Sequence, residues 1–248
     1  MNTILNYHLR EKFPPLDLIE KLFPKQFDRF VDPFCGSANV WTHGSFKESV
    51  LSDLNPRYID VLESVKNDCD GLVKALDEHK AKYGRRHFGM VKANRSEPNQ
   101  TQRSANWIFL NKCSYQQYFR FNKAEVFLGA YGDHQFCPNL YDLSDLHCIK
   151  DKLQNTHLKV SDFESQIDDC REGDFLYLHP PALLESVNYK QDFPLFDYER
   201  LSAAVVRAEK NKVKFLILLN KTHSINYMFL KRGKLWQLPS GEHAYYNY

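Results

Sequence analysis

Two short apolar segments, each ending in an acidic residue and separated by a turn of small residues, constrain the fold of this chain most. Residues 28–32 predict a first strand, and residues 33–40 predict a turn that leads into a helix. Residues 49–53 predict a second strand, and residues 56–66 predict the helix that follows it. A strand, a helix and a second strand form a βαβ unit, so we expect an α/β fold with a parallel sheet.

The ends of these two strands carry residues that are suited to binding an adenosine group. Gly36 in the turn lets the backbone approach a ligand closely. The carboxylate of Asp53, at the end of the second strand, can hold two ribose hydroxyls. The turn lacks the three-glycine pattern that the pyrophosphate of a dinucleotide requires. A helix cap that follows a strand has a similar sequence, and this alternative interpretation stays open.

Strands and helices alternate again in the second half of the chain. We expect helices at residues 15–23, 143–153 and 198–210, a short helix or turn at 162–169, strands at 157–160, 174–178 and 213–220, and a strand pair at the sheet edge within 235–248. Between the two halves, Gly84 and Pro98 interrupt helical stretches that are rich in polar, basic and aromatic residues. We therefore expect one core, residues 1–69 and 136–248, with a mostly helical insertion at residues 70–135.

The composition indicates a soluble globular protein. The chain has 248 residues, of which 43% are hydrophobic and 14% are aromatic, and no apolar run reaches the length of a membrane span. The first residues lack the features of a secretion signal, so we expect a cytoplasmic protein. The six cysteines form no Cys-x-x-Cys pair, which argues against a structural zinc site or a disulfide scaffold and indicates reduced, mostly buried thiols.

Positive charge is concentrated in one part of the chain. Of the 33 basic and 31 acidic residues, nine basic residues and one acidic residue lie within residues 81–123, so this segment carries +8 and the remainder −6. Such asymmetry indicates a module that faces a polyanion. The alternative is a basic helix face in contact with solvent.

Five segments, in order along the chain, resemble the motifs of one enzyme family. Residues 30–37 are similar to the S-adenosylmethionine motif of the Dam-type (D12 class) DNA adenine-N6 methyltransferases. Residues 52–56 resemble the family's ribose-holding motif, and residues 109–122 resemble its DNA-contacting segment. Residues 161–163 resemble the Asp-Phe pair that faces the adenine of the cofactor, and residues 173–178 resemble the strand that leads to the catalytic tetrapeptide.

The resemblance implies a Rossmann-like S-adenosylmethionine-dependent methyltransferase fold with a helical DNA-recognition insertion. It implies S-adenosylmethionine as the cofactor and double-stranded DNA as a partner, with no metal ion and no membrane. The residues assigned to the cofactor are Tyr7, Lys12, Asp32, Phe34, Gly36, Asp53, Asp162 and Phe163. The residues assigned to DNA, from the resemblance and from the basic segment, are Arg85, Arg86, Arg95, Arg103, Asn111, Lys112, Tyr115, Gln116, Arg120 and Asn122. The alternative for Tyr115, Tyr118 and Phe121 is a place in the core.

The catalytic tetrapeptide departs from the family pattern at both of its specialised positions. His179-Pro180-Pro181-Ala182 stands where the family has Asp-Pro-Pro-Tyr. The resemblance implies that the aspartate and the first proline carbonyl accept hydrogen bonds from the N6 amino group of a flipped-out adenine, and that the tyrosine stacks on this base. His179 offers no carboxylate, and Ala182 has no ring for stacking, which is worth about 1–3 kcal/mol per base.

Other departures affect the cofactor motifs and the DNA-contacting segment. Only Tyr7 and Lys12 match the family's N-terminal motif, and Ala38, which narrows the access of the cofactor, stands at the second glycine of the first motif. Loss of S-adenosylmethionine binding therefore stays open as an alternative. Gln117-Tyr118 replaces the family's Gly-Leu in the DNA-contacting segment, so no target sequence can be transferred from the family.

These features favour a pseudoenzyme. We expect that adenine methylation is lost or nearly lost and that the chain acts by binding DNA or a partner protein. We expect it in the cytoplasm of a bacterial or phage-infected cell, encoded by a phage or mobile element. The alternative is an active but divergent S-adenosylmethionine-dependent DNA adenine-N6 methyltransferase, in which His179 and the Pro180 carbonyl still orient an amino group. A third class is a regulatory binding protein that uses the fold without DNA.

Overall fold

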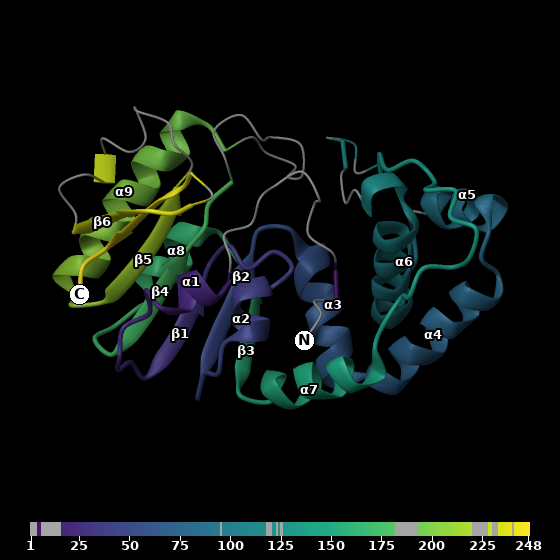
Figure 1. Ribbon diagram of the computed structural model, residues 1–248, viewed down its shortest axis with the longest axis horizontal. Coiled ribbons are helices and arrows are strands. Elements are labelled where there is room, and N and C mark those ends of the chain that lie inside the picture. Colours follow the sequence, from purple (N-terminus) through teal and green to yellow (C-terminus); the bar gives the residue numbers. More distant parts are fainter. Residues whose placement is uncertain are drawn as a thin grey trace. The chain divides into compact units, whose positions relative to one another are not determined.

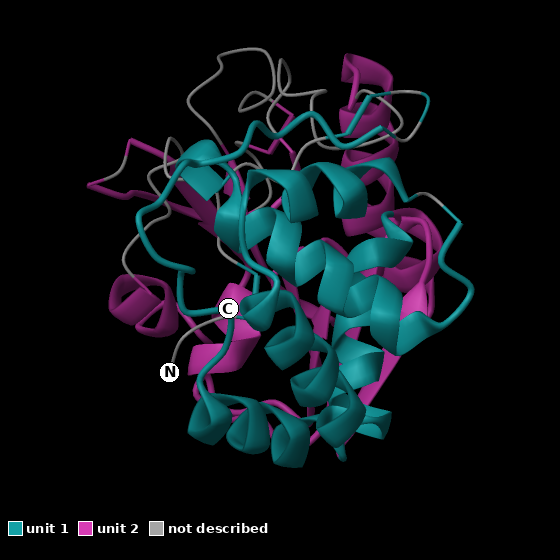
Figure 2. Ribbon diagram, turned by 90° about the vertical axis from the view of Figure 1, so that its right-hand side faces the viewer, with its two compact units in different colours: residues 1–11, 55–154, 187–191 teal, residues 12–54, 155–186, 192–248 magenta. Residues whose placement is uncertain are grey.

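The computed structural model contains two compact units (Figure 2). It describes residues 4–5, 16–94, 96–117, 121–122, 124, 126–181, 193–219, 228–229, 233–239 and 241–248. The first unit, called the helical unit, comprises Met1–Glu11, Asn55–Gln154 and Val187–Gln191. The second, called the sheet unit, comprises Lys12–Leu54, Asn155–Ser186 and Asp192–Tyr248.

The sheet unit is built on a sheet whose described part has seven strands in the order β3-β2-β1-β4-β5-β7-β6 (Figure 1). The strands are β1 (Arg29–Asp32), β2 (Ser49–Asp53), β3 (Thr156–Val160), β4 (Asp174–Leu178), β5 (Lys214–Leu219), β6 (Lys234–Gln237) and β7 (His243–Tyr246). The first five strands pair in parallel, whereas β7 runs antiparallel between β5 and β6. The predicted strands are confirmed, including the strand pair at the sheet edge.

Continuous apolar runs explain why the central strands form. Every residue of β4 is buried, as is all of β5 after Lys214, as expected for parallel strands that are covered on both faces. The helices of this unit are α1 (Leu16–Glu20), α2 (Asn39–His43), α8 (Phe163–Asp168) and α9 (Leu195–Lys210). α9 buries Leu201 and Val205 in one core with Phe215 and Ile217 of β5. This packing holds the central strands in place, and with them the polar residues at their carboxyl ends.

The helical unit is organised around α6 (Gln100–Cys113), whose residues Ile108, Phe109 and Leu110 are buried. Its other helices are α3 (Pro56–Asn67), α4 (Cys69–Ala81), α5 (Arg85–Ala93) and α7 (Leu143–Leu153). The predicted insertion, residues 70–135, contains most of α4 and all of α5 and α6, and the same compact unit also includes α3 and α7. None of the helices in the described residues is long and apolar enough to cross a membrane.

Candidate functional site

Two buried carboxylates lie at the carboxyl ends of the adjacent strands β1 and β2. Asp32 is 3% exposed and Asp53 is 1% exposed. Gly36 N donates a hydrogen bond to Asp53 Oδ2 over 2.9 Å, and Phe34 N donates one to Asp32 Oδ1 over 3.0 Å. Gly36 has a φ of +48°, a left-handed conformation that glycine adopts at little cost. The two carboxylates therefore hold the turn that follows β1.

Burial gives the carboxyl group of Asp32 an unusual affinity for its proton. Removal from water is the main reason that the pKa of Asp32 is raised to about 7. The Phe34 N–H lowers this pKa, the charge of Asp53 raises it, and His179 lowers it slightly. A perturbed, buried carboxyl group at a strand end is a candidate functional group, because a bound cation would compensate its charge.

The hydroxyl of Tyr177, on β4, is a second polar group in the interior of the sheet unit. Tyr177 is 2% exposed, and among the described residues its hydroxyl has no hydrogen-bond partner. Burial, with the charges of Asp32 and Glu242, holds the pKa of Tyr177 well above its usual value. Because buried polar groups are almost always hydrogen-bonded, this hydroxyl is a candidate contact for a polar ligand.

Aromatic rings gather beside the turn that follows β1. The rings of Phe34 and Phe163 are stacked with centroids 5.3 Å apart, and Phe193 packs against both. Asp162 is the N-cap of α8 and also pairs with Arg200 over 2.8 Å. The structure therefore brings together Phe34 and Phe163, which the resemblance assigns to the cofactor, while the carboxylate of Asp162 pairs with an arginine.

The turn after β1 keeps a left-handed residue at the position of the family's second glycine. Ala38 has φ of 56° and ψ of 35°, and its N–H donates to Cys35 O over 2.6 Å. A left-handed conformation costs a non-glycine residue about 1–2 kcal/mol. Ala38 therefore adopts, at this cost, a conformation that glycine adopts readily.

The altered tetrapeptide follows β4, and its first residue has a partner that the sequence did not suggest. His179 Nε2 lies 3.1 Å from Glu242 Oε1, and the two side chains are 19% and 9% exposed. The Tyr198 hydroxyl donates to the carbonyl of Pro181. Ala182 lies outside the described residues. No local motif marks Glu242, because only the antiparallel placement of β7 beside β5 brings it to this edge of the sheet.

Two predicted DNA-binding arginines begin α5 in the helical unit. Arg85 and Arg86 are exposed, and the Arg85 side chain is 72% exposed. Arg85 lies 3.4 Å from Asp133 and 5.3 Å above the ring of Tyr131. An ion pair at this exposure contributes about 0–1 kcal/mol, so it leaves the arginine accessible to a phosphate.

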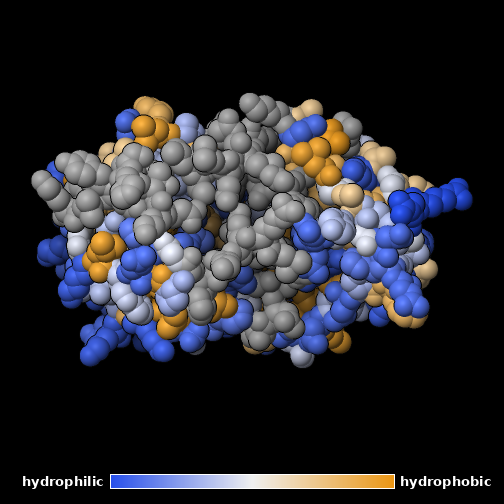
Figure 3. All heavy atoms as spheres, turned by 45° about the horizontal axis from the view of Figure 1, so that its top comes forward, coloured by the Kyte–Doolittle hydropathy of each residue, from blue (hydrophilic) through white to orange (hydrophobic). Residues whose placement is uncertain are grey.

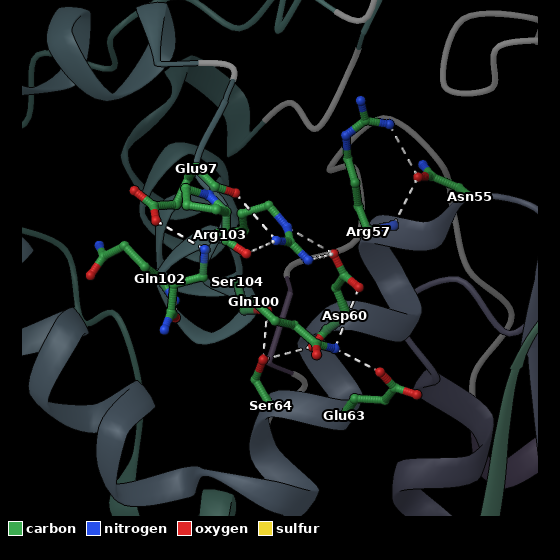
Figure 4. Close-up of polar contacts among 12 residues, drawn as sticks. Asn55, Arg57, Asp60, Glu63, Ser64, Glu97, Gln100, Gln102, Arg103 and Ser104 are labelled. Carbon is green, nitrogen blue, oxygen red and sulfur yellow. Dashed lines mark hydrogen bonds and ion pairs between the residues drawn. The ribbon is translucent and has the colours of Figure 1, made fainter.

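Two other predicted DNA-binding cations are used within the helical unit. Arg103 donates to Asp60 Oδ2 from Nε over 3.3 Å and from Nη2 over 3.2 Å, and to the carbonyl of Glu97 over 3.2 Å (Figure 4). Lys112 is 8% exposed, and burial lowers its pKa to about 8. Both cations therefore support the packing of the unit.

The predicted DNA-contacting segment contains a sharp turn at Tyr115–Gln117. Tyr115 is 57% exposed, whereas Asn111 is fully buried and its Nδ2 donates to the carbonyl of Gln117 over 2.9 Å. Gln116 and Gln117 both have φ of 55°. Gln117, which stands at the family's glycine, thus has a left-handed backbone, and Asn111 stabilises the turn that presents Tyr115.

A buried arginine that the sequence prediction missed supports the end of this segment. Arg57 is 8% exposed, and its guanidinium lies 4.0 Å from the ring centroid of Phe121 and 5.2 Å from that of Trp107. Phe121 is therefore a core aromatic, as the alternative interpretation has it. The next residue, Asn122, is exposed, and its Oδ1 accepts a hydrogen bond from Val126 N over 2.9 Å.

The other predicted residues that lie outside the described ones are Tyr7, Lys12, Arg95, Tyr118 and Arg120. Within the described ranges, no group of three or more His, Cys, Asp or Glu side chains is placed to hold a metal ion. Figure 3 shows hydrophilic residues over much of the described surface on one face, with separate hydrophobic patches between them.

The role of Arg103 in packing leads to a first prediction. We expect Arg103→Ala to lower the free energy of unfolding by about 1–2 kcal/mol, because charge-assisted hydrogen bonds to Asp60 and to backbone carbonyls are lost at a partly exposed site. Urea unfolding measures this loss, with the exposed Lys74→Ala as the control. A fully stable Arg103→Ala variant whose DNA binding is weakened would instead assign Arg103 to DNA.

The strand order and the strand-end carboxylates define the class of protein. A parallel sheet with one antiparallel strand between β5 and β6, and with acidic residues ending β1 and β2, is a Rossmann-like methyltransferase fold. The family model for D12 class N6 adenine-specific DNA methyltransferase matches residues 11–244. The chain belongs to this family, which confirms the predicted family and fold.

Two relatives illustrate this membership. The type II methyltransferase M.MjaIII of Methanocaldococcus jannaschii is 27% identical over 249 residues, which cover 90% of this chain and 83% of that protein. The DNA adenine methylase of Haemophilus influenzae is 25% identical over 228 residues, which cover 84% and 76%. Family membership implies S-adenosylmethionine as methyl donor and DNA as substrate.

Proposed function

We propose that this chain is a DNA-binding pseudo-methyltransferase, in which the transfer of a methyl group to adenine N6 is lost or strongly reduced. The observation that carries the proposal is the contact of His179 Nε2 with Glu242 Oε1 at 3.1 Å. At the position where the family's aspartate accepts a hydrogen bond from the target amino group, this chain has an imidazole that is held by a carboxylate. The loss of such a pre-organised acceptor costs about 10²–10³ in rate.

The cofactor side of the site retains groups that suit S-adenosylmethionine. We assign Asp53 to the ribose hydroxyls, Phe34 and Phe163 to the adenine, and Asp32 to the cationic methionine end. The burial of the two carboxyl groups and the stacking of the two rings support this assignment. The hydroxyl of Tyr177 has no hydrogen-bond partner among the described residues, and the charge of Asp32 helps to raise its pKa, which supports a polar ligand there. S-adenosylmethionine supplies an activated methyl group when it is bound. We propose that this face still binds the cofactor, with Tyr7 and Lys12 as further contacts from the family resemblance.

The DNA side of the proposal rests on the exposed groups of the helical unit. Arg85 and Arg86 are accessible to phosphates, and Tyr115 and Asn122 are exposed on the segment that resembles the family's DNA contacts. We also include Gln116, Arg95 and Arg120 among the DNA-binding residues, on the basis of the family resemblance and the basic segment of the sequence. Because Arg103 and Lys112 are used within the unit, we assign them to its packing.

Salt-dependent binding to mixed-sequence double-stranded DNA tests this proposal. We expect binding at low salt that weakens steeply as salt rises, because phosphate contacts release counterions. We expect the same affinity, within about twofold, for His179→Ala, because His179 lies outside the helical unit. The absence of binding at low salt would contradict DNA binding and would favour the class in which the fold binds a partner protein.

A second candidate is an active but divergent adenine-N6 methyltransferase. The observation in its favour is the same hydrogen bond, because a neutral imidazole that donates from Nε2 to Glu242 has its acceptor at Nδ1. That nitrogen and the Pro180 carbonyl would then orient an amino group. Labelled methyl transfer to DNA that disappears in His179→Ala would establish this candidate.

A further inference from the structure

The partner of His179 comes from a distant part of the chain. Glu242 directly precedes β7, which pairs antiparallel with β5 so that His243 lies opposite Leu219. β5 pairs in parallel with β4, with Ile217 opposite Leu178, the residue before His179. The start of the antiparallel strand β7 therefore lies at the same end of the sheet as the carboxyl ends of β4 and β5. This places Glu242 beside the tetrapeptide.

The contact is well defined on both sides. Glu242 O accepts a hydrogen bond from Leu238 N over 2.9 Å, and Gly241 N donates to Leu238 O over 2.9 Å, so the turn that carries Glu242 is fixed. The Glu242 side chain is 9% exposed and that of His179 is 19% exposed. With Glu242 as a carboxylate, which only accepts hydrogen bonds, the donor of this bond is His179 Nε2. The pair is thus a largely desolvated, charge-assisted hydrogen bond.

We propose that Glu242 is the positioning residue of the altered tetrapeptide, and that its carboxylate makes position 179 unsuitable for the aspartate of the family. An aspartate at 179 would direct a second carboxylate toward Glu242 in a site with little water. Two carboxylates that share such a site cannot both ionise without strong repulsion. Asp32 adds to this effect, since its charge already interacts with His179. The inference rests on the proposed function only in taking position 179 as the target-amine position.

This proposal explains how the change at 179 is maintained. His179 and Glu242 are matched to each other, as a donor and an acceptor, so His179→Asp alone loses a hydrogen bond and gains a repulsion. Glu242→Gln keeps the size of the side chain, removes its charge and supplies an amide donor. A restored aspartate is therefore expected to be compatible with Gln at 242 and incompatible with Glu at 242.

A mutant cycle on the full chain tests the proposal. The proteins are wild type, His179→Asp, Glu242→Gln and the double variant, each unfolded in urea at neutral pH. We expect His179→Asp to lower the urea midpoint by about 1 M, and the double variant to recover at least half of this loss. If the contact between His179 and Glu242 only stabilised the fold, Glu242→Gln would not restore the stability that His179→Asp loses. If the losses of the two single variants add in the double variant, the proposal is overturned.

His179→Asn is the matched control, because asparagine has the size of aspartate without its charge. We expect it to lower the midpoint by less than half as much as His179→Asp, since Glu242 then faces an amide. Equal losses in the two variants would mean that side-chain size is responsible, and would overturn the proposal. This control stays decisive if His179→Asp fails to fold while His179→Asn folds, because that difference is the expected result.

Methyl transfer gives a second readout that separates this proposal from the proposed function. With Ala182→Tyr added, we expect the variant that also carries His179→Asp and Glu242→Gln to methylate DNA at least tenfold faster than the variant that keeps Glu242. Equal, measurable rates in the two would overturn the role of Glu242. Methyl transfer by wild type would contradict the proposed loss of activity and would leave the outcome of the unfolding cycle unchanged.

Discussion

Asp32→Asn is expected to be more stable than wild type at pH 8 by about 4 kcal/mol, because the pKa of Asp32 rises from 3.8 in the unfolded chain to about 7 in the folded chain. The neutral carboxyl group supports folding fully below pH 4. This contribution is lost as the pH rises from about 4 to about 7, where the buried group must ionise. The stability difference between the two proteins should therefore grow by about 3 kcal/mol between pH 5 and pH 8.

Urea unfolding at these two pH values measures the effect. The exposed Asp70→Asn serves as the control for removal of a surface carboxylate. Asn keeps the oxygen that accepts the Phe34 N–H, so the comparison isolates the charge. The same variant should bind S-adenosylmethionine about 10- to 100-fold more weakly, because a charge-assisted contact is worth about 1.5–3 kcal/mol. A stability difference that is the same at pH 5 and pH 8 would contradict the raised pKa.

Replacement of Arg85 and Arg86 by glutamine is expected to weaken binding to double-stranded DNA about 10- to 100-fold at low salt. Both side chains are exposed at the start of α5, and a phosphate competes for Arg85 with a surface ion pair to Asp133 and the ring of Tyr131. If each arginine neutralises one phosphate, the slope of log affinity against log salt should fall by about 2. Fluorescence anisotropy with a labelled duplex, repeated over a range of salt concentrations, measures both quantities.

The matched control removes the same charge from another part of the helical unit. Lys74 and Lys80 are exposed on α4, and Lys74→Gln with Lys80→Gln changes the net charge by the same amount. We expect this control to change affinity by less than threefold and to leave the salt slope nearly unchanged. Equal losses from the two pairs would show that DNA senses only the net charge, and would remove Arg85 and Arg86 from a specific contact surface.

The sheet could be predicted from the sequence because its central strands are buried on both faces. β4 and β5 are nearly continuous apolar runs, and the acidic residues that end β1 and β2 mark the edge where the site lies. The strand ends are therefore visible in the sequence, and with them the positions of Asp32 and Asp53. The family resemblance adds the order of the motifs along the chain, and the order of the strands in the sheet comes from the structure.

The partners of individual side chains could not be predicted, because tertiary packing decides them. Arg103 and Arg85 belong to one basic segment, yet Arg103 binds Asp60 on α3 whereas Arg85 is exposed. Glu242 meets His179 only through the register of β7 beside β5. The distribution of charges along the chain predicts neither the different contacts of the two arginines nor the contact of Glu242 with His179.

The glycines of the family motifs show another limit of reading residue types. Ala38 and Gln117 stand at positions of family glycines, and both have a left-handed backbone, with φ of 56° and 55°. The sequence does not predict this conformation for non-glycine residues, because it costs about 1–2 kcal/mol each. The main departure at the site is therefore in side-chain chemistry, at His179 and its partner.

Labelled methyl transfer from S-adenosylmethionine to mixed-sequence double-stranded DNA tests the central claim most directly. The measurement uses wild type and His179→Ala at protein concentrations that saturate DNA binding, so that weak binding cannot explain a low rate. We predict that incorporation by wild type does not exceed that of His179→Ala, because position 179 offers no carboxylate to the target amine. Incorporation by wild type at least tenfold above the His179→Ala level would contradict the claim and would identify an active adenine methyltransferase.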